Sequence, residues 1–218
     1  DGDEIIDATP AIEETVRRFI GDLSLANLPR KFKSAISGCP DHCTLHEIND
    51  LALVGVVHPE LGAGYDLWVG GGLSTNPKLG VRLVAFVTPE RVPEVWHGVV
   101  QLFRDYGYRR LRTRARLKFL VADMGVEWVR TTLEKEYLTA PLPDGPPPAP
   151  PRSEGRDHVG IHRQRDGRYA VGFAPRAGRL SGAALAAVAD LADRFGAGRI
   201  RATTTQKLVI LDVAESDL

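Results

Sequence analysis

The chain has 218 residues with 28 basic and 28 acidic side chains, so its formal net charge is zero. That balance argues against a general nucleic-acid or membrane-surface binder, which needs an excess of cations. A hydrophobic fraction of 43% supports a packed core in roughly one or two domains.

Several features of the sequence indicate a cytoplasmic protein. No run approaches the ~20 continuous apolar residues of a membrane helix, and the acidic N-terminal stretch lacks a signal-peptide profile. Two cysteines are too few for a disulfide framework. Because the sequence starts without methionine and stops just after an apparent strand, we expect it to be a fragment of a longer protein.

The N-terminal part, residues 1–138, mixes helical and extended patterns. Apolar residues at helical spacing and punctuating prolines and glycines predict helices at 10–20, 76–87, 93–107, 111–125 and 126–138. Short apolar runs predict strands at 31–37, 51–57 and 65–71.

A proline-rich stretch then separates this part from a second unit. Residues 139–157 favour extended conformations, which predicts a semi-rigid linker; a proline-rich recognition motif is the alternative. Residues 158–218 predict a β-β-α-β-β order, with Ser181 as the N-cap of the helix. We therefore expect an α+β protein: a mixed α/β unit followed by one helix on an antiparallel sheet.

The first candidate site is the cluster Arg30-Lys31-Phe32-Lys33. In an extended strand Lys31 and Lys33 point to one face and Phe32 to the other. Two ammonium groups on one face repel each other unless an anion lies between them. The pattern fits two solvated lysines on a strand edge and also fits an anion-binding or catalytic site.

The second candidate site is the arginine run, residues 109–118. On a helix Arg112 and Arg116 would lie one turn apart on one face. No acidic residue occurs between 106 and 122, so no neighbour in sequence offsets the repulsion. A solvated arginine face is one interpretation, and a ligand with several carboxylates or phosphates is the other.

Two further motifs remain open. The glycines at 70–72 permit close backbone approach after a strand, but their spacing fits neither a dinucleotide fingerprint nor a P-loop. Cys39 and Cys43 form a C-x3-C pair, which cannot by itself complete a zinc or iron–sulfur site. His42 and His46 are the neighbours that could join them in a zinc site.

Four stretches together resemble one family. They are NLPRKFKSAISG…HEINDLALVGV, GYDLWVGGGLSTNPKLG, LFRDYGYRRLRTRARLKFLV and HVGIHRQRDGRYAVGF. In order and spacing they are similar to the sirohaem-dependent nitrite and sulfite reductases, and among these to the bacterial ferredoxin-dependent sulfite reductases. The resemblance covers essentially the whole chain.

The resemblance implies an architecture and a reaction. Family members have two pseudo-symmetric halves, each pairing a ferredoxin-like unit with a sirohaem-binding unit. Residues 1–138 resemble the first sirohaem-binding unit and residues 158–218 the second ferredoxin-like unit. The implied activity is reduction of sulfite to sulfide with electrons from reduced ferredoxin at a sirohaem–[4Fe-4S] centre, without nucleic acid or membrane as partner. The fragment alone is expected to be inactive.

The resemblance also implies residue roles. Lys31 and Lys33 match lysines that bind the oxyanion and help to deliver protons, and Arg30 is a partner for sirohaem carboxylates. The basic contact to sirohaem falls at Arg116 or Lys118, a choice that the sequence leaves open. Gly71 and Gly72 match a loop close to the macrocycle.

The cysteines depart from the family pattern. Relatives place the [4Fe-4S] ligands in the second sirohaem unit, so the resemblance implies that the cluster ligands lie downstream of this fragment. Cys39 and Cys43 are weak candidates for a metal or cluster, the other interpretation being a retained ancestral pattern.

Other functions also fit parts of the sequence. A ferredoxin-dependent nitrite reductase shares every motif quoted. A precorrin-3B synthase-like enzyme shares the fold, and a non-catalytic module that binds an anion or RNA would also use the arginine run.

Overall fold

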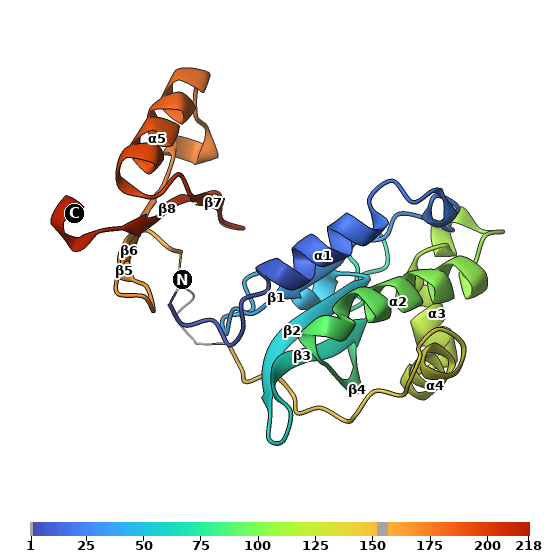
Figure 1. The fold of residues 1–218 in the computed structure, drawn as a ribbon. Coiled ribbons are helices and arrows are strands. Elements are labelled where there is room, and N and C mark those ends of the chain that lie inside the picture. The colour runs from blue at the N-terminus through green and yellow to red at the C-terminus, as the bar shows by residue number, and fades with distance from the viewer. Residues whose placement is uncertain (1, 152–156) are drawn as a thin grey trace. The chain divides into compact units, whose positions relative to one another are not determined.

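The computed structural model describes residues 2–151 and 157–218, and the chain divides into two compact units (Figure 1). One unit comprises residues 5–151, and the other comprises residues 152–218 together with residues 1–4. Each unit has its own sheet and its own apolar core.

The larger unit is built on a four-stranded mixed sheet in the order β1-β2-β3-β4. The strands are β1 (Ser34–Ser37), β2 (Leu51–His58), β3 (Gly62–Val69) and β4 (Val81–Val87). Strands β2, β3 and β4 pair antiparallel, whereas the edge strand β1 pairs parallel with β2. The three strands expected at 31–37, 51–57 and 65–71 are therefore present, the first of them shortened at its start.

Four α-helices accompany this sheet: α1 (Thr9–Phe19), α2 (Val92–Tyr106), α3 (Leu117–Met124) and α4 (Val126–Glu136). Helices α1 and α2 pack against each other and lie along the sheet (Figure 1). Alternate residues of the strands, such as Leu53 and Leu67, share one core with Val99 and Phe103 of α2. Burial of this apolar stripe is the main term that stabilises the unit.

The helix predicted over 76–87 is wrong, because residues 81–87 form strand β4. Leu83, Ala85 and Val87 are buried at alternate positions, which is the period of a strand. A short apolar run rich in valine fits either structure by pattern alone. Pairing with β3, in which Trp68 lies opposite Arg82, decides in favour of the strand.

The helix predicted over 111–125 is shorter than expected. Arg112–Arg114 form a 3-10 turn, and α3 begins only at Leu117. The predicted stop is confirmed, because Gly125 takes a left-handed φ of 84° and its N–H donates to the Val121 carbonyl.

Part of the proline-rich stretch packs on the larger unit. Leu142 is buried in the core, and the Pro143 carbonyl accepts from the Phe86 N–H. The Arg91 guanidinium donates to the Ala140 and Pro141 carbonyls. Residues 139–145 are thus anchored to the unit, whereas residues 152–156 lie outside the described part of the chain.

The smaller unit has the expected β-β-α-β-β order. Its strands β5 (Gly160–Arg163), β6 (Tyr169–Phe173), β7 (Ile200–Ala202) and β8 (Leu208–Val213) pair antiparallel in the order β5-β6-β8-β7. Helix α5 (Gly182–Phe195) packs Val188 and Ala192 against Ile210 and Val213 of the sheet. The predicted N-cap is confirmed, since the Ser181 Oγ accepts from the Ala184 N–H at 3.1 Å.

Within residues 2–151 and 157–218, no helix is both long enough and apolar enough to cross a membrane.

A buried ion pair joins β3 to β4. The Arg82 guanidinium donates to both carboxylate oxygens of Asp66, at 2.6 and 2.8 Å, and the Trp68 Nε1–H donates to the same carboxylate at 2.7 Å. Burial raises the pKa of Asp66, whereas Arg82 and Trp68 act to lower it. The pair therefore keeps an ionised carboxylate in an apolar sheet only while Arg82 is present.

We expect Arg82→Met to lower the free energy of unfolding by about 3–5 kcal/mol, because it leaves Asp66 buried and unpaired. All three tryptophans (Trp68, Trp96 and Trp128) belong to this unit, so fluorescence during denaturation reports its unfolding. The control is Arg17→Met, which removes only the exposed pair with Glu14 and should leave the midpoint unchanged.

The difference in free energy of unfolding between the wild type and Arg82→Met should become smaller as the pH falls. Burial raises the pKa of the Asp66 carboxyl in the folded protein above its value in the unfolded chain. The loss of stability caused by its buried charge is therefore complete above the folded pKa and disappears below the unfolded pKa. A deficit that stays constant from neutral to acidic pH would show that Asp66 is not the cause.

Candidate functional site

The lysine segment, residues 30–33, leads into the edge strand β1. Lys31 and Lys33 are exposed, whereas the Phe32 ring between them packs at 5.9 Å from the Phe103 ring. The Lys33 N–H donates to the Asp50 carboxylate at 2.9 Å, and its carbonyl accepts from the Leu51 N–H. The backbone is thus fixed by β2 and by Asp50, while both ammonium groups remain accessible to a ligand.

Asp50 is the residue that the sequence analysis missed. It is fully buried, and its carboxylate accepts two hydrogen bonds from the Arg116 guanidinium, at 3.1 and 2.6 Å. Its carbonyl also accepts from the Gly70 N–H at 2.9 Å. Burial raises the pKa of Asp50, and Arg116 and the Lys33 amide offset part of that rise. Asp50 therefore connects the lysine segment, the glycine turn and the arginine run.

The only signal for Asp50 in the sequence was its position. It is an acidic residue directly before the buried strand β2, where a carboxylate at the start of an apolar run needs a partner. The partner, Arg116, lies 66 residues further along the chain, so sequence distance conceals the pair.

The glycine turn, residues 70–72, lies against the segment that precedes β2. The Gly71 N–H donates to the Asn49 carbonyl at 2.9 Å. A methyl group added at Gly71 would lie 2.2 Å from the Glu47 carbonyl oxygen, so only glycine allows this approach. At Gly72 the same methyl would meet only flexible side-chain ends, Arg116 Nη2 at 3.3 Å and Lys118 Cδ at 3.4 Å.

Lys118 is buried and holds the loop that follows the glycine turn. Its Nζ donates to the carbonyls of Leu73 at 2.7 Å, Asn76 at 2.5 Å and Gly72 at 3.3 Å. Burial, and then the nearby Arg116 charge, lower the pKa of Lys118. Three carbonyl acceptors use all three N–H groups of the ammonium.

The arginine run is folded differently from the expected helix face. Arg112 lies in the 3-10 turn and Arg116 caps α3, so the two do not share one α-helical face. The absence of acidic neighbours in sequence is made up by tertiary partners, Asp50 for Arg116 and Asp123 for Arg114 at 2.8 Å. The repulsion inferred from the sequence is thus partly relieved by the fold itself.

The lysine segment and the arginine run lie side by side. The Arg30 guanidinium donates to the Arg112 carbonyl at 2.5 Å, and Arg109 donates to the Asn27 carbonyl at 2.8 Å. The fold therefore gathers residues 30–33, 70–78 and 109–118, which we call the basic site. The basic site contains every candidate site residue expected from the sequence except the two cysteines.

A polar cavity of about 400 Å³ lies between two of these segments. Residues from the loop after the glycine turn and from the arginine run form most of its wall: Thr75, Asn76, Lys78, Thr113, Arg114, Phe119 and Asp123. Lys78 and Arg114 are its cations, and Asp123, which pairs with Arg114 at 2.8 Å, is its one carboxylate. The lining therefore keeps one positive charge in excess beside several hydrogen-bonding groups, which suits a polar or anionic guest.

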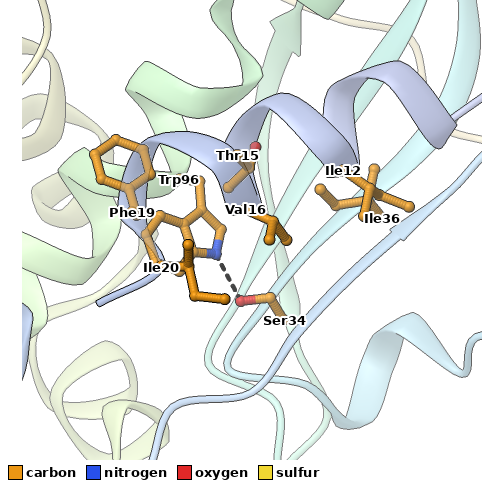
Figure 2. Close-up of a pocket in the computed structure, with 8 residues that line it drawn as sticks. All are labelled: Ile12, Thr15, Val16, Phe19, Ile20, Ser34, Ile36 and Trp96. Carbon is orange, nitrogen blue, oxygen red and sulfur yellow. Dashed lines mark hydrogen bonds between the residues drawn. The ribbon is translucent and has the colours of Figure 1, made fainter. Parts of the chain in front are cut away.

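A second, apolar groove of about 430 Å³ lies elsewhere on the unit, between α1, β1 and α2 (Figure 2). Ile12 and Val16 of α1 face Ile36 of β1 across it, and the Trp96 indole N–H donates to the Ser34 hydroxyl at 2.8 Å. No charged side chain lines this groove, so it does not offer the anion chemistry of the basic site.

The cysteines lie outside the basic site, in the loop after β1. Cys39 and Cys43 are both free and half-buried. In residues 2–151 and 157–218 no three His, Cys, Asp or Glu side chains are arranged to hold a metal ion. The zinc set considered from the sequence, in which His42 and His46 join the cysteines, is therefore not assembled in this part of the chain.

Comparison with known proteins gives two family matches. The nitrite and sulphite reductase 4Fe-4S domain matches residues 1–142. The nitrite/sulfite reductase ferredoxin-like half domain matches residues 162–218.

The individual relatives are named either sulfite reductases or nitrite reductases. The chain is 58% identical over 98% of its length to "Sulfite reductase [ferredoxin]" of Mycobacterium tuberculosis, and 39% identical over 98% to "Assimilatory ferredoxin-dependent nitrite reductase" of Haloferax mediterranei. The solved structure of the Mycobacterium tuberculosis NirA protein superposes with a TM-score of 0.91 at 59% identity over 98% of the chain. The chain spans only 38–39% of the length of these relatives.

The two neighbouring glycines provide a matched test of the turn. We expect Gly71→Ala to lower the free energy of unfolding by about 1–3 kcal/mol, because its methyl group meets backbone that cannot move aside. Gly72→Ala should cost clearly less, since only flexible side-chain ends need to shift. Denaturation followed by tryptophan fluorescence measures both, and equal losses would contradict this account of the turn.

Proposed function

The chain belongs to the nitrite and sulfite reductase family, and we propose that it is part of a ferredoxin-dependent sulfite reductase, which reduces sulfite to sulfide. The observation that carries the proposal is the basic site itself. Two exposed lysines stand on a rigid segment beside a glycine turn and an arginine run, in a chain 58% identical to a sulfite reductase.

The residues of the basic site fit sirohaem, a macrocycle with eight carboxylates. The polar cavity carries Lys78 and Arg114, of which Arg114 is paired with Asp123 in the same wall, and the buried glycine turn sets the shape of the loop beside it. When bound, sirohaem supplies the iron at which sulfite is held and receives electrons. Arg30 is suited to a carboxylate at the edge of the macrocycle, and the buried glycines Gly71 and Gly72 to letting the loop beside the macrocycle pack closely on the segment before β2.

Between Arg116 and Lys118, the count of free donors favours Arg116 for a contact with a sirohaem carboxylate. A guanidinium has five N–H donors, and the pair with Asp50 uses two of them. Lys118 has already given its three N–H groups to carbonyls of the loop. We therefore assign Arg116 to the ligand and Lys118 to holding the loop in shape.

Lys31 and Lys33 are assigned to the substrate. Their ammonium groups neutralise the charge of the bound oxyanion, and each oxygen that leaves as water must be protonated, which an ammonium can do. The Asp50 hydrogen bond to the Lys33 N–H fixes where these groups stand. Positioning of this kind is what makes such charges effective in catalysis.

The [4Fe-4S] cluster is assigned to another part of the complete protein. A cluster of this type needs four cysteine thiolates, and the chain contains two cysteines in all. Reduced ferredoxin as electron donor and a cytoplasmic location complete the proposal, the first from the names of the relatives and the second from the low cysteine count.

Nitrite is the second candidate substrate, because relatives that are 39% and 34% identical are named nitrite reductases. The higher identity to the sulfite reductase favours sulfite. We expect the complete enzyme to have the larger kcat/KM with sulfite, measured against nitrite with the same electron donor. A larger value for nitrite would reverse the assignment.

Replacing the lysines tests their role directly. In the complete enzyme, we expect Lys31→Met and Lys33→Met each to lower kcat/KM for sulfite by roughly 10²–10³-fold, because each removes a charge that stabilises the reacting anion. Sirohaem content, read from the visible spectrum, should be unchanged. The matched control is Lys135→Met on α4, an exposed lysine outside the basic site. If a variant with both Lys31→Met and Lys33→Met kept the wild-type kcat/KM for sulfite, the assignment would be refuted.

We also expect the 218 residues alone to show no turnover of sulfite. They span 38% of the length of the sulfite reductases they match and contain too few cysteines for the cluster. Measurable sulfide release by this chain with reduced ferredoxin would contradict the proposal that the [4Fe-4S] cluster is bound by another part of the complete protein.

A further inference from the structure

The loop that contains both cysteines is a double turn. The His42 N–H donates to the Cys39 carbonyl at 3.2 Å, and the Leu45 N–H donates to the His42 carbonyl at 2.9 Å. His42 and Leu45 both take left-handed φ values, of 52° and 50°. The turns reverse the chain between Cys39 and Cys43 and bring the two half-buried side chains close to each other.

The two thiols are not equivalent. Hydrogen bonds from the Cys43 thiol and from the Asp41 and Cys43 backbone N–H groups lower the pKa of Cys39, so Cys39 is the more readily ionised of the two thiols. The hydrogen bond between the two thiols and burial raise the pKa of Cys43, which stays protonated. A half-buried thiolate beside a protonated thiol is the arrangement of an attacking and a resolving cysteine.

The neighbouring histidines pack on each other and on Trp68. The His42 and His46 rings meet edge to face at 4.8 Å, and His46 packs in the same way on Trp68 at 4.5 Å. Burial lowers the pKa of both rings, so they are neutral. In the described ranges no third ligand joins the sulfurs, which favours thiol chemistry over metal binding.

We propose that Cys39 and Cys43 are a redox-active dithiol, which a low-molecular-weight disulfide oxidises to an intrachain disulfide. The Cys39 thiolate attacks one sulfur of the oxidant, and a mixed disulfide forms as one thiolate leaves. Cys43 then loses its proton and attacks the Cys39 sulfur, which releases the second thiol. Two protein thiols are oxidised and one disulfide is reduced to two thiols, so electrons and atoms balance.

Hydrogen bonds through Asn49 and Glu47 connect the cysteine loop to the glycine turn of the basic site. The Asn49 side chain donates to the Leu45 carbonyl at 2.9 Å, and the Asn49 carbonyl accepts from the Gly71 N–H. The Glu47 carbonyl accepts from the Gly80 N–H at 2.7 Å. A disulfide that tightens the loop therefore acts on residues that support the glycine turn.

The test uses the complete protein, purified with its cofactors under reducing conditions. It is treated with oxidised glutathione, free thiols are alkylated, and the protein is digested with trypsin. In the sequence, the tryptic peptide from Ser34 to Lys78 contains both cysteines. We expect this peptide to lose the mass of two hydrogens and to carry no alkyl group, a change that dithiothreitol reverses.

Single variants separate the two roles. Cys43→Ser should trap one glutathione on Cys39, because no resolving thiol remains, whereas Cys39→Ser should trap far less. A peptide in which both thiols are alkylated after oxidation overturns the proposal, as does equal trapping in the two variants. Zinc that copurifies with the wild type and is lost in both variants would also overturn it, in favour of a metal site.

Discussion

The basic site depends on one buried ion pair, that between Asp50 and Arg116. A carboxylate at the start of a fully buried strand would be costly without a cation, and the guanidinium reaches it from the N-cap of α3. The same carboxylate holds the Lys33 amide, and the same residue's carbonyl holds Gly70. Three segments distant in sequence are thereby placed around one residue, and removing the Asp50 carboxylate would free both the Lys33 amide and the Arg116 guanidinium.

The charges of the site divide into two groups with different tasks. Arg114, Arg116 and Lys118 have partners inside the protein, from carboxylates or from backbone carbonyls. Lys31 and Lys33 have their backbone fixed and their ammonium groups exposed. The internal partners fix where the first group stands, and the exposed lysines, together with the Arg116 N–H donors that Asp50 does not use, are available for an anion. This division explains how a chain with zero net charge can still offer a concentrated cationic surface.

The apolar groove and the cysteine loop show how chemistry is separated on this unit. The groove between α1 and β1 is lined by no charged side chain, although its Ser34 directly follows Lys33 of the basic site (Figure 2). The cysteine loop follows β1 directly and is bound to the glycine turn through Asn49. Both features belong to the edge strand of the sheet, which is the element that carries the lysine segment.

Local periodicity and turn chemistry were enough to predict an α+β chain with two units, most helices and strands, the Ser181 cap and the stop at Gly125. The sequence also marked the lysines, the arginines and the glycines as candidates. Three features could be seen only in the folded chain: residues 81–87 form a strand, the arginine run is not one helix, and Asp50 is the partner of Arg116. The reason is physical: strand pairing and ion pairing depend on residues far along the chain, and no local pattern records which of them will meet.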